Sequence, residues 1–167
     1  MRVAFLLCLC ALALILACSE DSPTPESNLP VETLSITNDS GVFQTVKIKV
    51  ELTCTNDDRA RGLMLRTSMG EDYGMLFFMA PGRFGFWMKN TLIPLTAIFI
   101  NADGVIVHME DMQPQTMDIH NTTVPYYYGL EVNQGWPDRH DIAIGDTVRF
   151  PWPSNPPPGA PPSCEAT

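Results

Sequence analysis

The chain has 167 residues, of which 19 are Asp or Glu and 10 are Lys or Arg, giving a formal net charge of −9 at pH 7. This acidic balance argues against binding of nucleic acid or an anionic lipid surface, because both require Lys and Arg against phosphate groups. Between the two terminal segments described below lie roughly 120 residues, a length that suits one domain with a single core.

The N-terminus has the pattern of a lipoprotein signal peptide. Arg2 is followed by an uncharged apolar run from Val3 to Ala17, which is too short to span about 30 Å of hydrocarbon. The segment Ile15-Leu16-Ala17-Cys18 resembles a bacterial lipobox, in which the cysteine is diacylated and becomes the new N-terminus. We therefore expect cleavage after residue 17 and lipidation (palmitate or a related acyl chain) of Cys18. An ordinary secretory signal with an incidental cysteine is the alternative.

Residues 18–30 predict a disordered tether, because they are rich in Ser, Asp, Glu, Asn and Pro and offer little apolar surface to bury. Acyl chains on Cys18 would anchor this tether in a bilayer. Ser19 is similar to the residue that follows the cysteine in lipoproteins sorted to the outer membrane. The expected location is thus the cell envelope, on the outer membrane facing the periplasm.

Two cysteines remain after the signal peptide and Cys18 are set aside, namely Cys54 and Cys164. Thiols in an oxidising compartment favour a disulfide. Such a bond would clip the proline-rich tail, residues 151–167, to the domain. Two free thiols are the alternative.

Short apolar segments follow one another through the domain. Val46, Ile48, Val50 and Leu52 alternate with polar residues, which predicts a half-buried strand. Thr55 and the acids after it favour a helix N-terminus, and a short helix is expected over 59–65. Gly62 is expected either to end this helix or to let a backbone pass close. Further strands are expected at 74–79, 84–90, 95–100, 105–109, 126–132 and 147–150, with a turn at 101–104 and loops at 113–124 and around Gly135.

Strands at roughly ten-residue spacing with one short helix predict a mainly β domain, a single antiparallel sandwich or barrel-like fold. The expected organisation is a signal peptide at 1–17, the tether at 18–30, the domain at 31–150 and the tail at 151–167.

Several patches of the domain carry a family resemblance. The longest is Phe86-Trp-Met-Lys-Asn-Thr-Leu-Ile-Pro-Leu95, and the others are Arg61-Gly-Leu-Met64 with Arg66, Gly74-Met-Leu-Phe77, Leu130-Glu131 and Gly145-Asp146. In this order they resemble the signature of the family known as domain of unknown function 192, which implies an all-β fold from about residue 46 to 150. The family usually has Asp after Pro-Leu, whereas this chain has Thr96, so a mechanism that needs a carboxylate there is not available.

The signature segment suggests a ligand platform. In a strand, Trp87 and Lys89 share one face and Phe86 and Met88 the other. With Asn90 and Thr91, an exposed Trp and Lys could bind a polar ligand. The alternative is a core strand with Lys89 stacked over Trp87 as a cation–π pair.

Arg61, Arg66 and Glu131 are further candidates, because an Arg fork suits a carboxylate or phosphate. A pocket with Arg61 and Lys89 would favour a small anionic ligand. Alternatively, Arg61 pairs with Glu131 or Asp146 to fasten the helix to the sheet.

A rival hypothesis is metal handling. His108, Met109, Met112, Met117 and His120 lie within thirteen positions, and thioethers with imidazoles select Cu(I). Met is also an ordinary filler of β cores.

No catalytic motif is evident in the sequence, and no cofactor is implied. We therefore expect a lipid-anchored envelope module that binds a ligand or an envelope protein and is not an enzyme. Metal handling is the second hypothesis. A hydrolase or transferase acting on an anionic envelope substrate is the third, and it would require Arg61, Lys89 and Glu131 to converge in a deep cleft.

Overall fold

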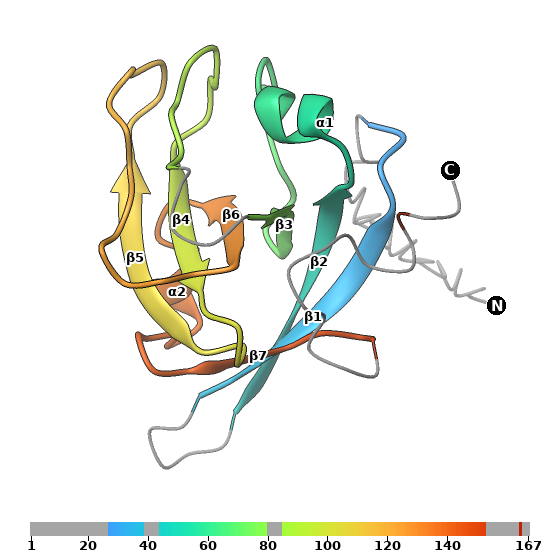
Figure 1. The fold of residues 1–167 in the computed structure, drawn as a ribbon, viewed down its shortest axis with the longest axis vertical. Helices are drawn as coiled ribbons and strands as arrows, with labels where there is room; N and C mark the ends of the chain where they lie inside the picture. Colours follow the sequence, from blue (N-terminus) through green and yellow to red (C-terminus); the bar gives the residue numbers. More distant parts are fainter. Residues whose placement is uncertain (1–26, 39–43, 80–84, 153–163, 165–167) are drawn as a thin grey trace, which may run out of the picture.

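Seven strands form one curled sheet, a half-barrel, in the computed structural model, which describes residues 27–38, 44–79, 85–152 and 164 (Figure 1). The strands are β1 (Val31–Thr37), β2 (Thr45–Thr53), β3 (Tyr73–Phe78), β4 (Leu95–Ile100), β5 (Ile106–Met112), β6 (Tyr128–Asn133) and β7 (Thr147–Arg149). Two short helices, α1 (Asn56–Arg61) and α2 (Trp136–Arg139), lie in the connections.

The order of strands across the sheet is β5-β4-β6-β3-β2-β1-β7. β2 and β3 run parallel, and the other neighbouring pairs run antiparallel. The mainly β class is confirmed, but the expectation of a purely antiparallel sheet is wrong. The sheet is mixed because the connection through α1 returns the chain to the end of the sheet where β2 began, so that β3 repeats the direction of β2.

The two edges of the sheet meet at one end. A bridge joins Val105 to Thr147, and the Val148 amide donates to the Gly104 carbonyl at 2.7 Å. Gly104 has φ +82°, and a Cβ there would lie 2.5 Å from the Val148 carbonyl oxygen. A glycine is thus required where the edges touch, and the curl buries the residues inside it.

Each face of the sheet has its own apolar cluster. The inner cluster draws on β1, β2, β5 and β7 as well as the central strands, and includes Trp136 from α2. The outer cluster draws on β3, β4 and β5 and includes residues that lie outside the strands, notably Leu63, Phe86, Met88 and Tyr126. The outer face is therefore closed by connections and not by a second sheet, among the residues that the structure describes.

Several local predictions need correction. In place of the strand expected at 84–90, the structure has a single bridge between Phe86 and His120, because the residues next to Phe86 pair with no other strand. Residue 84 lies outside the described residues. The loop expected around Gly135 contains α2, with Pro137 in its first turn. β1 was missed, since its apolar alternation is limited to Leu34 and Ile36. The helix begins at Asn56, earlier than expected, and ends at Arg61, with Gly62 as its C-cap.

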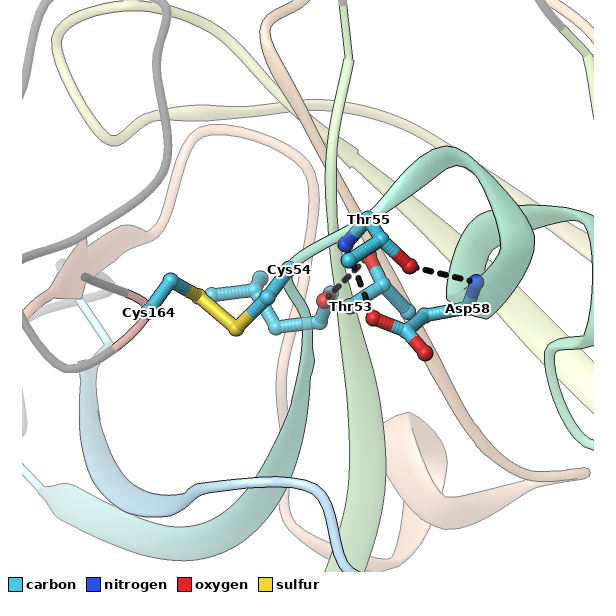
Figure 2. Close-up of a disulfide and its surroundings, with 6 residues drawn as sticks. Thr53, Cys54, Thr55, Asp58 and Cys164 are labelled. Carbon is cyan, nitrogen blue, oxygen red and sulfur yellow. Dashed lines mark hydrogen bonds between the residues drawn. A yellow bond between two sulfur atoms is a disulfide. The ribbon is translucent and has the colours of Figure 1, made fainter. Parts of the chain in front are cut away.

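The start of α1 lies beside a disulfide (Figure 2). Thr55 Oγ1 accepts from the Asp58 amide at 3.1 Å, and the Asp58 carboxylate accepts from the Thr55 amide at 2.8 Å, a capping box. The preceding residue, Cys54, is bonded to Cys164, with 5.3 Å between the two Cα atoms. Cys164 and Trp152, from the proline-rich tail, both pack against the inner cluster.

We expect the bond between Cys54 and Cys164 to stabilise the fold, because it closes a loop with a sequence separation of 110 residues. Loss of the bond in Cys54→Ser should lower the free energy of unfolding by roughly 4–5 kcal/mol at most, measured by urea denaturation. Mass spectrometry of unreduced, alkylated protein should show no label on either cysteine. Labels on both would contradict the bond.

Candidate functional site

A pocket of about 400 Å³ opens on the outer face of the sheet. Its apolar lining comes from β3, from the turn after α1 and from the segment around Phe86. Its polar lining comes from α1, from β6 and from Thr91. The lining residues are Asn56, Arg59, Ala60, Arg61, Gly62, Leu63, Met64, Phe77, Phe78, Met79, Gly85, Phe86, Trp87, Thr91 and Glu131.

Glu131 is the acid of this pocket. It lies on β6, in register with Met75 of β3 and Ala97 of β4, and only 5% of its surface is exposed. No hydrogen-bond or ion-pair partner for its carboxyl group is found among the described residues. Burial raises the pKa of Glu131 to about 8, because an apolar environment disfavours the charged form. The carboxyl group is consequently protonated at neutral pH.

Two other acids occupy the same row across the sheet. Glu51 of β2 is in register with Met75, and Glu110 of β5 is in register with Ala97, so both share the face of Glu131. Arg66 binds Glu51 through two hydrogen bonds of 2.6 and 2.5 Å, and His120 Nδ1 lies 2.9 Å from Glu110. Glu131 thus differs from both neighbours in facing a pocket instead of a basic side chain.

Aromatic rings form the wall beside Glu131. The Phe77 and Phe86 rings meet edge to face, with centroids 5.0 Å apart. Phe86 also lies over Gly129, which is two residues before Glu131 on the same face of β6; a Cβ at Gly129 would come within 2.2 Å of that ring. Gly129 therefore lets Phe86 approach the sheet and narrow the pocket on the side of Glu131.

The cationic side of the pocket comes from α1. Arg59 is half-buried and Arg61 is exposed, and both line the pocket. Arg59 Nη2 donates to Asn56 at 2.5 Å. Arg61 forms no ion pair within the described residues, so the alternative in which it pairs with Glu131 or Asp146 is not observed. Asp146 instead accepts from the Ala143 amide at 2.8 Å.

The signature residues divide between two environments. Phe86 and Met88 are buried while Trp87 and Lys89 are exposed, as the alternation predicts. Lys89 Nζ lies 5.2 Å from the centroid of the Trp87 ring, so the predicted cation–π contact is present. Trp87 lines the pocket and Lys89 does not.

The next two signature residues shape the backbone. Asn90 has φ +56°, and its carbonyl accepts from the Leu65 amide at 2.8 Å, which ties the turn after α1 to the signature segment. Thr91 is buried and lines the pocket. The structure therefore brings together Arg61, Trp87, Thr91 and Glu131, but not Lys89 or Asn90.

The five residues of the metal hypothesis are dispersed. Met112 is fully buried in the outer cluster, Met109 packs against the inner cluster, and Met117 is 57% exposed. His108 and His120 flank Glu110, at 3.9 and 2.9 Å. The described residues contain no group of three or more His, Cys, Asp or Glu arranged to hold a metal ion.

Part of the pocket lining was not predicted from the sequence. Arg59 and Leu63, and the rings of Phe77 and Phe78, were not predicted as site residues, because nothing in a single sequence shows which core side chains border a cavity. The patch around Arg61 was the available signal, since Leu63 lies within it.

These features define the chain as a mainly β half-barrel domain with a buried acid in an outer-face pocket. The chain belongs to the DUF192 family, described as "Uncharacterized ACR", whose model matches residues 36–150. The family resemblance of the sequence is thereby confirmed.

Two solved structures are similar to this chain. A proposed transcription regulator from Sinorhizobium meliloti 1021 is 33% identical, with a TM-score of 0.69, and the match covers 75% of this chain and 97% of that one. A protein of unknown function from Novosphingobium aromaticivorans DSM 12444 is 32% identical, with a TM-score of 0.67, and the match covers 76% and 90%. No curated protein matches the chain.

The membrane expectations rest on the sequence alone. Cys18 and the signal peptide lie outside the described residues. Within the described part of the chain, no helix is long and apolar enough to cross a bilayer. Ser27, at the end of the expected tether, donates to the Glu51 carboxylate, and Leu29 packs against the outer cluster.

We expect Glu131 to make stability depend on pH. Its carboxyl ionises near the ordinary pKa of 4.5 when unfolded and near 8 when folded. Between these values the unfolded state binds fewer protons, so the free energy of unfolding falls as pH rises. Glu131→Gln should therefore gain roughly 2–4 kcal/mol over the wild type between about pH 5 and pH 8 in urea unfolding. An equal difference at both pH values would contradict the raised pKa.

Gly129→Ala should disturb the pocket wall, because the added Cβ would clash with the Phe86 ring. We expect a loss of about 1–3 kcal/mol in the free energy of unfolding. Combining it with Phe86→Leu should cost less than the sum of the two single changes, since the smaller side chain relieves the clash. Additive costs would show that the ring is not the obstacle.

Proposed function

We propose that this protein is a lipid-anchored envelope module that binds a small amphipathic ligand with an anionic group in the pocket around Glu131. The observation that carries the proposal is a buried carboxyl group without a protein partner, facing a pocket of about 400 Å³. Buried polar groups are normally satisfied within the fold, and an exception calls for an explanation. A ligand that completes the hydrogen bonding of Glu131 supplies one.

The pocket has the size and lining of a small-molecule site. Its volume falls in the range of about 300–1,000 Å³ typical of ligand pockets. Phe77, Phe86 and Trp87 offer apolar surface, and Arg61 offers a charged fork suited to a carboxylate or phosphate. A few polar groups amid an apolar wall fix the orientation of a ligand without the need for chemistry.

An anchor on Cys18 would place this site in the envelope. Acylation of Cys18 would hold the domain at a bilayer, and residues 19–26 would set the distance between the domain and the bilayer surface. The acidic chain would be repelled by an anionic surface, which favours a domain held away from the lipid with its pocket accessible. A protein partner in the envelope also fits this arrangement, because Trp87, which lines the pocket, is 39% exposed.

A second candidate is acid–base catalysis by Glu131, favoured by its pKa of about 8, which is suited to proton transfer near neutral pH. It ranks lower because Glu131 is the sole carboxylate among the described lining residues, and none of them is Cys, Ser or His. Lys89, required for the cleft expected of a hydrolase or transferase, lies outside the pocket.

The pocket hypothesis is tested by filling the cavity. Ala60 is an exposed residue of α1 that lines the pocket, so Ala60→Trp should block it without disturbing the core. Asp57→Trp adds the same side chain to an exposed position of the same helix outside the lining, and serves as the matched control. A thermal-shift panel of amphipathic carboxylates, amino acids, glycan fragments, peptides and Cu(I) would be run on the mature wild-type chain and on both variants.

We expect a stabilising ligand to raise the melting temperature of the wild type and of Asp57→Trp by several degrees, and to leave Ala60→Trp unchanged. A ligand that stabilises all three proteins equally binds elsewhere. A response only to Cu(I) would favour the metal hypothesis instead. Membrane fractionation of Cys18→Ser tests the anchor independently, with loss from the membrane fraction as the expected result.

A further inference from the structure

We infer that the ligand of this pocket is a small zwitterion, whose ammonium group pairs with Glu131 and whose acid group faces Arg59 and Arg61. The inference rests on the function proposed above and adds the charge arrangement of the ligand. It is carried by the positions of the charged side chains around the cavity.

The pocket has opposite polarity at its two sides. Glu131 comes from β6, an interior strand of the sheet, and is almost completely buried, whereas Arg59 and Arg61 come from α1 and are half-buried and exposed, respectively. These are the charged side chains among the described lining residues. A ligand that spans the cavity from sheet to helix therefore meets a carboxyl group at its inner end and guanidinium groups at its outer end.

An ammonium group fits the inner end. The other two acids of the row, Glu51 and Glu110, each have a basic partner, and Glu131 lacks one. The rings of Phe77, Phe86 and Trp87 line the same cavity, and aromatic faces attract cations. In an environment of low dielectric constant, a cation bound beside the carboxylate gains more than it would in water.

An acid group fits the outer end. Arg61 has no ion pair with the described residues, and its fork suits a carboxylate or phosphate. The chain as a whole carries a net charge of −9, so an anion gains attraction only where cations gather locally. A ligand with an ammonium group alone would be repelled by the two arginines at the helix.

Binding of such a ligand should release a proton. Burial holds the pKa of Glu131 at about 8, so the empty pocket carries a neutral carboxyl group at pH 7. An incoming ammonium group stabilises the carboxylate, and the displaced proton goes to solvent. The charged groups that surround Glu131 are Arg59 and Arg61 from α1 and the pairs Glu51–Arg66 and Glu110–His120 on either side. Glu131 is the acid of this set that lacks a basic partner among the described residues.

The test uses ω-amino acids, in which a methylene chain separates the two charges. 6-Aminohexanoate would be compared with hexylamine, hexanoate and hexanol by calorimetry on the mature wild-type chain, and shorter and longer ω-amino acids would locate the best spacing. We expect 6-aminohexanoate or a neighbour to bind at least tenfold more tightly than the matched amine, acid or alcohol. Repeating the titration at pH 7 in buffers of different ionisation enthalpy should show release of close to one proton.

Variants assign each charge. Glu131→Gln should weaken the ω-amino acid at least tenfold and abolish proton release, while leaving hexanoate binding unchanged. Arg61→Gln should weaken the ω-amino acid and hexanoate but not hexylamine. Glu71→Gln and Arg149→Gln change exposed residues outside the pocket and serve as controls. The urea unfolding described above shows whether each variant is folded.

Two results would overturn the inference. In the first, hexanol or hexanoate binds as tightly as every ω-amino acid, and Glu131→Gln leaves that binding unchanged. The ligand is then not a zwitterion. The pocket is still a binding site if Ala60→Trp abolishes the binding of these compounds. If no compound of the series binds the wild type, the zwitterion is excluded. The proposed function itself fails only if, in addition, no compound of the broader thermal-shift panel loses its binding in Ala60→Trp.

Discussion

The parallel pairing of β2 with β3 is the constraint on which the rest of the structure depends. A parallel neighbour requires the chain to travel back along the sheet, and here it does so through α1 and the turn that follows. That return path lays Leu63 on the outer face of the sheet and brings Arg59 and Arg61 to the end of the sheet at which β2 ends. With a hairpin in place of the crossover, the outer face would lack both its cover and its cationic side.

The covering segments are held by backbone contacts and not by a second sheet. The Leu65 amide donates to the Asn90 carbonyl, the Gln115 amide donates to the Thr91 carbonyl at 3.1 Å, and Phe86 exchanges backbone hydrogen bonds with His120. Three connections from different parts of the sequence are thus joined at one end of the sheet, as Figure 1 shows for the loops at the end near α1. Their side chains do not fill the space above β6 completely, and the pocket is what remains.

The sequence predicted those parts of the fold that depend on local pattern. The alternation of Val46 to Leu52 and the turn before Val105 fix strands, and Thr55 with Asp58 fixes a helix start. The parallel pairing could not be read in this way, because the direction of β3 relative to β2 depends on where the connection leads. The isolated bridge at Phe86 has the same cause: the residues around it suit a strand but have no neighbouring strand with which to pair.

The site was predictable as a set of residue types but not as a geometry. Arg61 and Glu131 were recognisable candidates, since both lie in family motifs, yet their separation in the sequence gave no hint that they border one cavity without pairing. Nor could a sequence show that Arg66 satisfies Glu51 while Glu131 is left open, because three acids on three strands look alike until the register places them in one row.

That row explains why an unpaired acid is tolerated in the DUF192 domain of this chain. The Arg66 guanidinium neutralises Glu51, the Glu110 carboxylate lies 2.9 Å from His120 Nδ1, and protonation removes the charge of Glu131 itself. The cost of the arrangement is a group whose ionisation opposes folding above its ordinary pKa. Replacement by Gln or Met would remove that cost without altering the sheet. This balance is the physical ground for the proposal that a ligand binds the carboxyl group and turns its own acid toward the arginines on α1.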